Sequence, residues 1–277
     1  MKSNFQSKGG GEAVKGKITI FAVFGFIIFF GIVLTAPTLG FAEMKKEYYP
    51  DGKLHYEQNY ENGKLEGISK GYDESGKLFW EWNYRNGERE GISKEYYENG
   101  KAKWEWNYRN GEREGISKEY YESGGLKWGW NYENGKLEGV SKSYYESGKL
   151  MGEENYKNGE QEGMTKEYYP SGKLSCEWKY GNGIKGGVNR AYFQSGKLMG
   201  EWNYKNGERE GIGKEYYESG ELEAEENFKN GKLDGLYREY FQNGQIQYID
   251  TYKSGQKINT KAYDAEGKLK SDQNYPE

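Results

Sequence analysis

The sequence has very few of the residues on which most catalytic sites and metal centres depend. Its 277 residues include one cysteine, one histidine and four prolines. A single cysteine excludes an intramolecular disulfide, and a single histidine excludes most zinc sites and most Ser-His or Cys-His catalysis. Leu, Ile, Val and Phe together make up only 43 residues, too few for the thick interior of a compact enzyme. The composition therefore predicts no catalytic residues, no metal and no cofactor.

Glycine and the aromatic residues are abundant instead. The chain holds 42 glycines, 28 tyrosines and 8 tryptophans, and its formal net charge is only −4. Disordered chains combine few aliphatic residues with few aromatic residues and a high net charge. This sequence has the first property without the other two. Tyr and Trp are therefore expected to supply the core.

The first 42 residues differ in character from the rest. Four lysines precede an uncharged apolar run, Ile18–Leu34, and the small residues Gly40 and Ala42 come directly before Glu43. This order is typical of a secretory signal peptide, with cleavage after Ala42. An uncleaved membrane anchor formed by residues 18–34 is the alternative, because 17 apolar residues lie near the lower limit for crossing a bilayer. Both predictions place the remainder outside the cytoplasm, in the cell envelope or the medium.

The charge of that remainder indicates which partners to expect. Beyond residue 42 the chain has 36 basic and 43 acidic side chains, a net charge of −7, with the two signs interleaved. A nucleic-acid-binding protein would present a basic face, so no nucleic-acid partner is predicted. Membrane contact is predicted only through the N-terminal segment, if that segment is retained.

A 24-residue unit is repeated about nine times. The clearest marker is a glycine that follows Asn, or Ser in the last unit, at a constant spacing. This series contains Gly63, Gly87, Gly111, Gly135, Gly159, Gly183, Gly207, Gly231 and Gly255. A second glycine series runs at the same period from Gly52 to Gly244, and a third from Gly67 to Gly235. Such regularity identifies a repeat protein in which each unit contacts its neighbours.

Each unit is predicted to be a β-hairpin. Asn-Gly is the preferred pair for a type I′ turn, and the residues between the turns alternate with the period of a strand. In one arm Leu78, Trp80, Trp82 and Tyr84 are expected on one face. The third glycine series is expected to leave room for an aromatic ring over bare backbone. The predicted fold is all-β, an elongated antiparallel meander over residues 43–256, preceded by an N-terminal apolar helix and followed by a degenerate cap over residues 257–277.

The sequence resembles bacterial MORN-repeat variant proteins. The resemblance rests on the recurrent Tyr-Tyr-x-x-Gly-Lys-Leu, Glu-x-Asn-Tyr-x-Asn-Gly and closing glycine, as between Tyr96 and Gly115, and it covers about Tyr48 to Tyr275. It implies an extended sheet of β-hairpins without catalytic residues. Members are often labelled YwqK-type antitoxins of toxin–antitoxin pairs, and MORN repeats more broadly are implicated in protein scaffolding and in contact with membrane lipids. An antitoxin for an intracellular toxin would be cytosolic, whereas this chain is predicted to be exported.

The fold accounts for the positions that are constant in every unit, so positions that vary between units are the ones that can indicate a function. Two positions in each of three consecutive units are tryptophan, and the predicted ligand-binding residues are Trp80, Trp82, Trp104, Trp106, Trp128 and Trp130. These rings either thicken the core of the central units or form an exposed patch for a partner's apolar side chains or for sugar rings.

Other candidate residues carry less information. A glutamate recurs at one position of most units, and we expect it to pair with lysine across the strands. Its members are Glu57, Glu81, Glu105, Glu153, Glu177 and Glu201. Carboxylates bind Ca²⁺, but the Asp-rich loop of an EF-hand is missing from the sequence. His55 and Cys176 each occur once, in columns of unrelated residues.

The function predicted from these observations is an exported, non-enzymatic repeat protein whose sheet is a binding or scaffolding surface, most simply for another protein. One alternative is a cell-envelope carbohydrate-binding module that uses the tryptophan patch. Another is the antitoxin role implied by the family resemblance.

Overall fold

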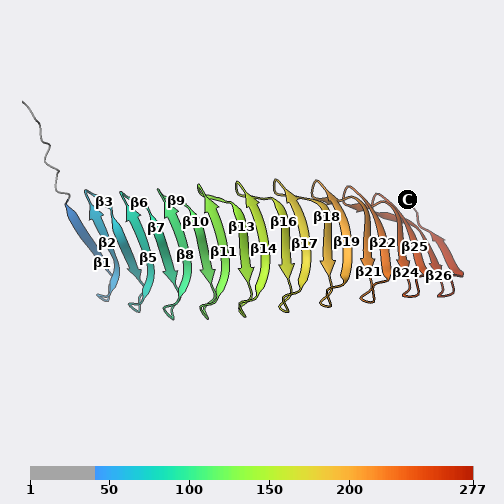
Figure 1. Cartoon of the computed structure of the whole chain (residues 1–277), viewed down its shortest axis with the longest axis horizontal. Helices are drawn as coiled ribbons and strands as arrows, with labels where there is room; N and C mark the ends of the chain where they lie inside the picture. The colour runs from blue at the N-terminus through green and yellow to red at the C-terminus, as the bar shows by residue number, and fades with distance from the viewer. Residues whose placement is uncertain (1–40, 277) are drawn as a thin grey trace, which may run out of the picture. The chain divides into compact units, whose positions relative to one another are not determined.

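The computed structural model describes residues 41–276, and these residues form a single antiparallel sheet of 27 strands without a helix (Figure 1). The apolar helix expected over Ile18–Leu34, and with it the choice between signal peptide and anchor, lies outside the described residues. Within residues 41–276 no helix is long and apolar enough to cross a membrane. The predicted all-β meander of hairpins is confirmed.

The strands follow one another along the sheet in chain order. The first arms of the hairpins are β2 (Leu54–Glu61), β5 (Leu78–Arg85), β8 (Ala102–Arg109), β11 (Leu126–Glu133), β14 (Leu150–Lys157), β17 (Leu174–Gly181), β19 (Leu198–Lys205), β22 (Leu222–Lys229) and β25 (Ile246–Lys253). The second arms are β4 (Gly67–Tyr72), β7 (Gly91–Tyr96), β10 (Gly115–Tyr120), β13 (Gly139–Tyr144), β16 (Gly163–Tyr168), β18 (Ile184–Tyr192), β21 (Gly211–Tyr216), β24 (Gly235–Tyr240) and β26 (Gln256–Tyr263). Two-residue strands precede most second arms: β3 (Lys64–Leu65), β6 (Glu88–Arg89), β9 (Glu112–Arg113), β12 (Lys136–Leu137), β15 (Glu160–Gln161), β20 (Glu208–Arg209) and β23 (Lys232–Leu233). The remaining strands are β1 (Ala42–Tyr48) and β27 (Leu269–Asn274).

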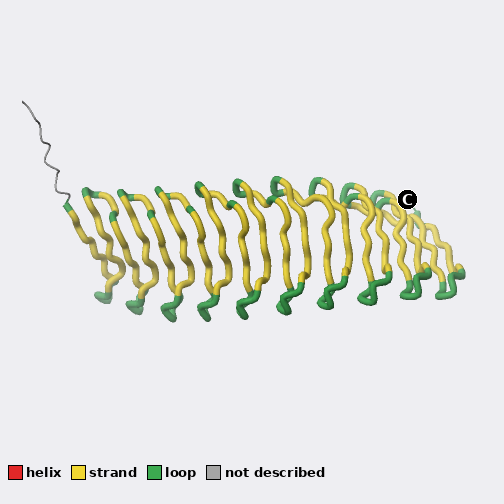
Figure 2. The backbone as a smooth tube through the Cα atoms, viewed as in Figure 1, coloured by secondary structure: helices red, strands yellow, loops and turns green. Residues whose placement is uncertain are grey.

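Turn residues determine where each hairpin reverses. The residue before the turn glycine, Asn in eight units and Ser254 in the last, has φ between 48° and 54°, and the glycine itself has φ between 73° and 91°. Positive φ at both central residues defines a type I′ turn, whose twist matches that of the strands. Figure 2 shows the turns at both ends of the strands. The turn type predicted from Asn-Gly is therefore confirmed.

A β-bulge near the start of each first arm changes which side chains share a face. Tyr72 pairs with Leu78, but the preceding residue, Gly71, pairs with Trp80, so Phe79 is an extra residue in β5. Paired residues lie on the same face of a sheet, and the extra residue reverses the alternation. Leu78 therefore lies on the opposite face from Trp80. The expectation that Leu78 shares a face with the tryptophans was wrong for this reason.

The bulge gives the sheet two chemically distinct faces. The tryptophan face carries the rows of Trp80, Trp82, Tyr84 and Ser69. The isoleucine face carries the rows of Ile68, Lys70, Glu81, Leu78 and Tyr72. Only the tryptophan face has a continuous fully buried row, that of the serines. The core of this single-layer sheet thus lies beneath the tryptophans.

The third glycine series has a different role from the one expected. Its eight members have φ between 66° and 106°, a region that side chains other than glycine rarely adopt. A Cβ atom on Gly67 or Gly211 would meet nothing within 4 Å, so no ring lies over these glycines. Rings cover Gly71 and Gly213 instead, where a Cβ would lie 2.1 Å from the Trp80 ring and 2.6 Å from the Trp202 ring. Backbone conformation, not space for a ring, explains the third series.

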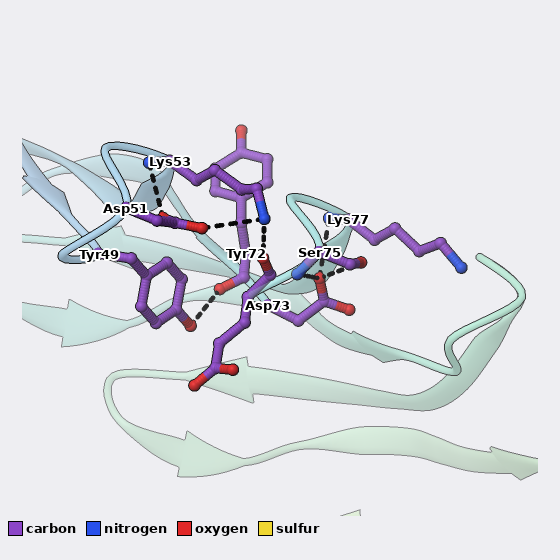
Figure 3. Close-up of polar contacts among 8 residues, drawn as sticks. Tyr49, Asp51, Lys53, Tyr72, Asp73, Ser75 and Lys77 are labelled. Carbon is purple, nitrogen blue, oxygen red and sulfur yellow. Dashed lines mark hydrogen bonds and ion pairs between the residues drawn. The ribbon is translucent and has the colours of Figure 1, made fainter.

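Side chains of one turn bond to the backbone of the next. The Tyr49 hydroxyl donates to the Tyr72 carbonyl at 2.9 Å, and Lys53 Nζ lies 2.6 Å from the Glu74 carbonyl oxygen and 3.0 Å from the Asp51 carboxylate (Figure 3). The same tyrosine-to-carbonyl bond recurs along the sheet from Tyr97, Tyr121, Tyr145, Tyr169 and Tyr217. Neighbouring units are therefore joined at their turns as well as through their strands.

The meander continues beyond residue 256. Strands β26 and β27 pair as an antiparallel hairpin with a bulge between Ala262 and Tyr263, as in the preceding units. Gly267, which falls one residue early in the sequence, has a φ of 82° in the connecting turn. The residues assigned from sequence to a degenerate cap thus form two further strands of the same sheet.

Candidate functional site

Four of the six predicted tryptophans form one row of parallel rings on the tryptophan face. Ring centroids are 5.5 Å apart between Trp106 and Trp104, 5.7 Å between Trp104 and Trp130, and 5.5 Å between Trp130 and Trp128, with interplanar angles of 14° or less. Trp80 and Trp82 form a separate pair at 4.1 Å. All six rings are half-buried. The structure thus brings the predicted residues together, and their ring faces are largely turned toward one another.

A buried serine row lies on the same face as these rings. Ser69 and Ser93 pair with Trp82 and Trp106, and both are 0% exposed. Ser117 and Ser141, in the same row, are each 1% exposed. The hydroxyls of Ser69, Ser117 and Ser141 have no hydrogen-bond partner among the described residues. The tryptophans therefore shield a narrow core whose polar atoms are partly unsatisfied.

Replacing one of these serines should raise stability. In Ser117→Ala we expect a gain of about 1 kcal/mol in the free energy of unfolding, because an unpaired buried hydroxyl costs roughly 1–3 kcal/mol. Ser93 is the matched control, since its hydroxyl accepts a hydrogen bond from the backbone amide of Asn83 at 3.4 Å. Ser93→Ala should therefore be neutral or slightly destabilising. Urea unfolding of both variants tests this, and equal effects at the two positions would contradict it.

A basic side chain lies over several of the tryptophan rings on this face. The Arg89 guanidinium lies 4.3 Å from the Trp82 centroid, and Arg209 lies 5.1 Å from that of Trp202. Lys185 Nζ is 4.8 Å from the Trp178 centroid. A cation over an indole contributes about 0.5–2 kcal/mol, depending on its desolvation. The chain therefore uses its own basic side chains to cover tryptophans.

The glutamate row lies on the isoleucine face and is engaged by lysine and tyrosine. Lys142 Nζ is 2.9 Å from the Glu153 carboxylate, and this bond lowers the pKa of Glu153 below its usual value. Lys70 pairs with Glu81 in the same way at 3.4 Å, and the Tyr96 hydroxyl donates to Glu81 at 2.5 Å. The expected pairing with lysine is confirmed for four members of the row, whereas Glu177 and Glu201 pair with Arg190. Among residues 41–276 no group of three or more His, Cys, Asp or Glu is placed to hold a metal ion.

A row of aliphatic side chains on the isoleucine face is exposed. Its exposed members are Ile68, Ile92, Ile116, Val140, Val188 and Ile212, between 38% and 59% exposed. Beside Ile116 and Val140, where Gly129 replaces the usual glutamate, there is a hollow of about 360 Å³ that Leu126 and Tyr144 also line. Sequence reasoning missed both this row and the serine row. Each could have been found in the sequence, because the same residue type recurs at intervals of 24 residues.

The single histidine and the single cysteine are separate in the structure. The His55 ring lies 4.3 Å from that of Tyr49, and its Nδ1 is 3.7 Å from the Glu47 carboxylate. Cys176 is half-buried, with its Sγ 3.5 Å from the Ser175 hydroxyl. The two residues lie in different units, far apart in the chain. Ligand binding by the six tryptophans remains a prediction.

Comparison with known proteins identifies the repeat. The family described as MORN repeat variant matches nine segments: residues 45–62, 65–86, 89–110, 113–127, 137–158, 161–182, 185–206, 209–230 and 233–254. A search of the curated proteins found no match. Among solved structures, one chain of the crystal structure of TcdB2-TccC3 is similar at 11% identity and a TM-score of 0.14, over 84% of this chain and 18% of that chain. Because the nine matched segments account for most of the sequence, the chain belongs to the MORN repeat variant family.

Proposed function

We propose that this MORN repeat protein is exported and non-enzymatic, and that its sheet binds another protein. The observation that carries the proposal is the exposed aliphatic row of the isoleucine face, in which Ile116 is 59% exposed. Isolated exposed aliphatic residues are ordinary on protein surfaces. A regular row of them on one face, by contrast, is typical of an interaction surface.

The spacing of the row suits an extended partner. Successive members lie two strands apart, roughly 10 Å along the sheet. Burying one isoleucine side chain fully contributes about 1.5–3 kcal/mol. About half of each side chain in the row is already buried, so a partner would gain about half of this amount per residue. Three or four adjacent members would therefore supply several kcal/mol, which is the scale of specific protein binding after the cost of association.

Two features support export and the absence of catalysis. The basic residues, apolar run and small residues of positions 1–42 have the order of a signal peptide, and cleavage after Ala42 would leave nearly all of β1 intact. The carboxylates of the isoleucine face are held in ion pairs and tyrosine hydrogen bonds. Such side chains stabilise a sheet and are poorly placed for acid–base chemistry.

The geometry favours a protein partner over a glycan. Sugar binding by tryptophan uses an open ring face. In the row from Trp106 to Trp128 the faces of the inner rings, Trp104 and Trp130, are occupied by neighbouring rings. The antitoxin alternative has no support beyond the family resemblance.

The test is a variant that removes the aliphatic row without altering the fold. Ile92→Thr, Ile116→Thr and Val140→Thr combined keep β-branched side chains in their strands and reduce the apolar surface. We expect unchanged far-ultraviolet circular dichroism and at least about a tenfold loss of affinity for a partner captured by crosslinking, identified by mass spectrometry and purified. Lys103→Ala, which changes a side chain in β8 outside the aliphatic row and beside the Tyr97 ring, is the control and should bind normally.

Two outcomes would contradict the proposal. Full partner affinity in the triple variant would show that this row is not the binding surface. Recovery of the protein only from the cytosol, with residues 1–42 retained, would contradict the proposal that it is exported.

A further inference from the structure

The row of tryptophans ends at a hollow on the tryptophan face. Trp128 is the last ring of the row, and it lines a hollow of about 490 Å³. In the next unit Gly152 and Glu154 occupy the positions that correspond to Trp128 and Trp130, so two rings of the row are missing. Gly152 is buried, and a Cβ there would lie 3.0 Å from the Ser143 hydroxyl. The hollow thus has an indole wall and a glycine floor.

Two carboxylates line this hollow without a cation beside them. Glu154 and Glu167 both line it, and neither forms an ion pair in the part of the chain that the structure describes. At the equivalent positions of other units, Glu226 pairs with Arg209 at 3.5 Å and Glu119 pairs with Lys127 at 2.7 Å. The two carboxylates therefore leave the hollow without an internal counter-ion, and within residues 41–276 Glu154 accepts a hydrogen bond only from the neutral Tyr156 hydroxyl.

The sequence explains why the cations are missing. Leu137 stands at the position that corresponds to Arg209, and Ser175 stands at the one that corresponds to Lys127. Ser175 lines the hollow, and Leu137 lies in β12, the strand that corresponds to the one from which Arg209 reaches Glu226. The effect reaches a neighbouring side chain: burial and then the charges of Glu154 and Glu167 raise the pKa of Tyr180 above its ordinary value.

Aromatic rings held in place complete the site. Tyr145 and Tyr169 line the hollow with Trp128. Their hydroxyls donate to the carbonyls of Tyr168 and Tyr192 at 2.6 Å and 2.7 Å, so the orientation of both rings is fixed before any ligand arrives. An indole wall with nearby carboxylates is the environment in which an ammonium or guanidinium group binds.

We propose that this hollow receives a lysine or arginine side chain of the partner protein, with its stem against Trp128 and its charge on Glu154 and Glu167. The inference rests on the proposed function and adds a second contact with the partner, because the hollow lies on the tryptophan face, opposite the aliphatic row of the isoleucine face. The chain supplies its own precedent, because Arg209 lies over Trp202 and pairs with Glu226. At the hollow the equivalent cation is left for the partner to provide.

The experiment supplies the missing cation from within the chain. We would titrate the protein, as recovered from cells, with a short Gly-Ser peptide carrying two lysines, using calorimetry at low salt. Ser175→Lys and Leu137→Arg each restore a residue that the repeat already accommodates, so both variants should fold. We expect saturable binding to the unmodified protein, and at least about a tenfold loss of affinity in either variant and in Glu154→Gln/Glu167→Gln.

Matched controls separate this site from general attraction to an acidic protein. Glu119→Gln removes one negative charge from a carboxylate that already has an internal partner, and it should leave peptide affinity within about twofold. The same peptide with glutamine in place of lysine should not bind. n-Butylammonium should bind far more weakly than the peptide; equal affinity would overturn the assignment to a protein side chain in favour of a free amine.

The remaining outcomes are also decisive. Peptide binding that is unchanged in Ser175→Lys and Leu137→Arg would overturn the inference. If these variants keep full affinity for the natural partner while the Ile92, Ile116 and Val140 variant loses it, the hollow is not part of the interface and the proposed function stands. If neither set affects the partner, the proposed function itself fails.

Discussion

Raising the pH from 9 to above 12 is expected to unfold the sheet in a single cooperative transition with the uptake of several hydroxide equivalents. The groups responsible are tyrosines whose hydroxyls are half-buried beside glutamates. Burial, followed by the hydrogen bonds to Glu105, Glu154 and Glu177, raises the pKa values of Tyr120, Tyr156 and Tyr192 to about 12. An unfolded tyrosine titrates near 10.

The direction of the effect follows from linkage. Because the folded pKa exceeds the unfolded value, each tyrosine stabilises the fold fully below pH 10, and this contribution is lost as the pH rises through about 12. Allowing for solvent screening at half-buried sites, each of the three contributes up to about 2 kcal/mol. Their joint loss approaches the total stability of many domains.

Phenolate absorbance at 295 nm and circular dichroism, followed together, test this prediction. Most tyrosines should ionise near pH 10, and a second group should ionise only together with the loss of structure. Tyr120→Phe should reduce the number of protons released in that second step by one. Ionisation of every tyrosine near pH 10 with an intact sheet would contradict the expectation.

Removal of Trp104, one of the two inner rings of the row, should destabilise the protein more than removal of an end ring, Trp106 or Trp128. Its ring lies between those of Trp106 and Trp130, so Trp104→Ala breaks two ring contacts and uncovers the buried serine row. We expect a loss of about 3 kcal/mol in the free energy of unfolding, near the lower end of the range for a buried tryptophan because this ring is half-buried.

A double-mutant cycle isolates the contribution of the row. The coupling between Trp104→Ala and Trp130→Ala should be about 0.5–1.5 kcal/mol. Trp178 is the comparison residue, because its ring contacts Lys185 and, within residues 41–276, stacks on no other tryptophan. The coupling between Trp178→Ala and Trp130→Ala should be close to zero. A zero coupling at Trp104 as well would mean that the rings pack independently, and the row would have no collective role.

Local turn chemistry made most of the fold predictable from sequence. Asn-Gly requires a particular hairpin turn, and its constant spacing leaves no room for any connection but the next hairpin. The faces were harder to predict, because the bulge at Phe79 reverses the alternation and an extra strand residue has no signature in a single sequence. The same bulge separates Leu78 from the tryptophans.

The candidate site was predictable only in part, for a related reason. The tryptophans are conspicuous by type, whereas the hollow beside Trp128 arises where Gly152 and Glu154 replace two rings. Its charge depends on two positions that are occupied by Arg209 and Lys127 in other units and by Leu137 and Ser175 here. Their significance depends on which strands lie next to one another and on which face each residue lies, and both follow from the register. Comparing equivalent columns for missing cations would have pointed to these positions, but not to the hollow that Ser175 lines.

Because each unit pairs only with its immediate neighbours, equivalent residues are spaced at constant intervals along the sheet. Two strands return the chain to the same direction and the same face, so one unit advances any surface feature by roughly 10 Å without inverting it. Inserting or deleting 24 residues on either side of the hollow would therefore change its distance from that end of the sheet in fixed steps. The order of units in the sequence thus specifies lengths as well as contacts.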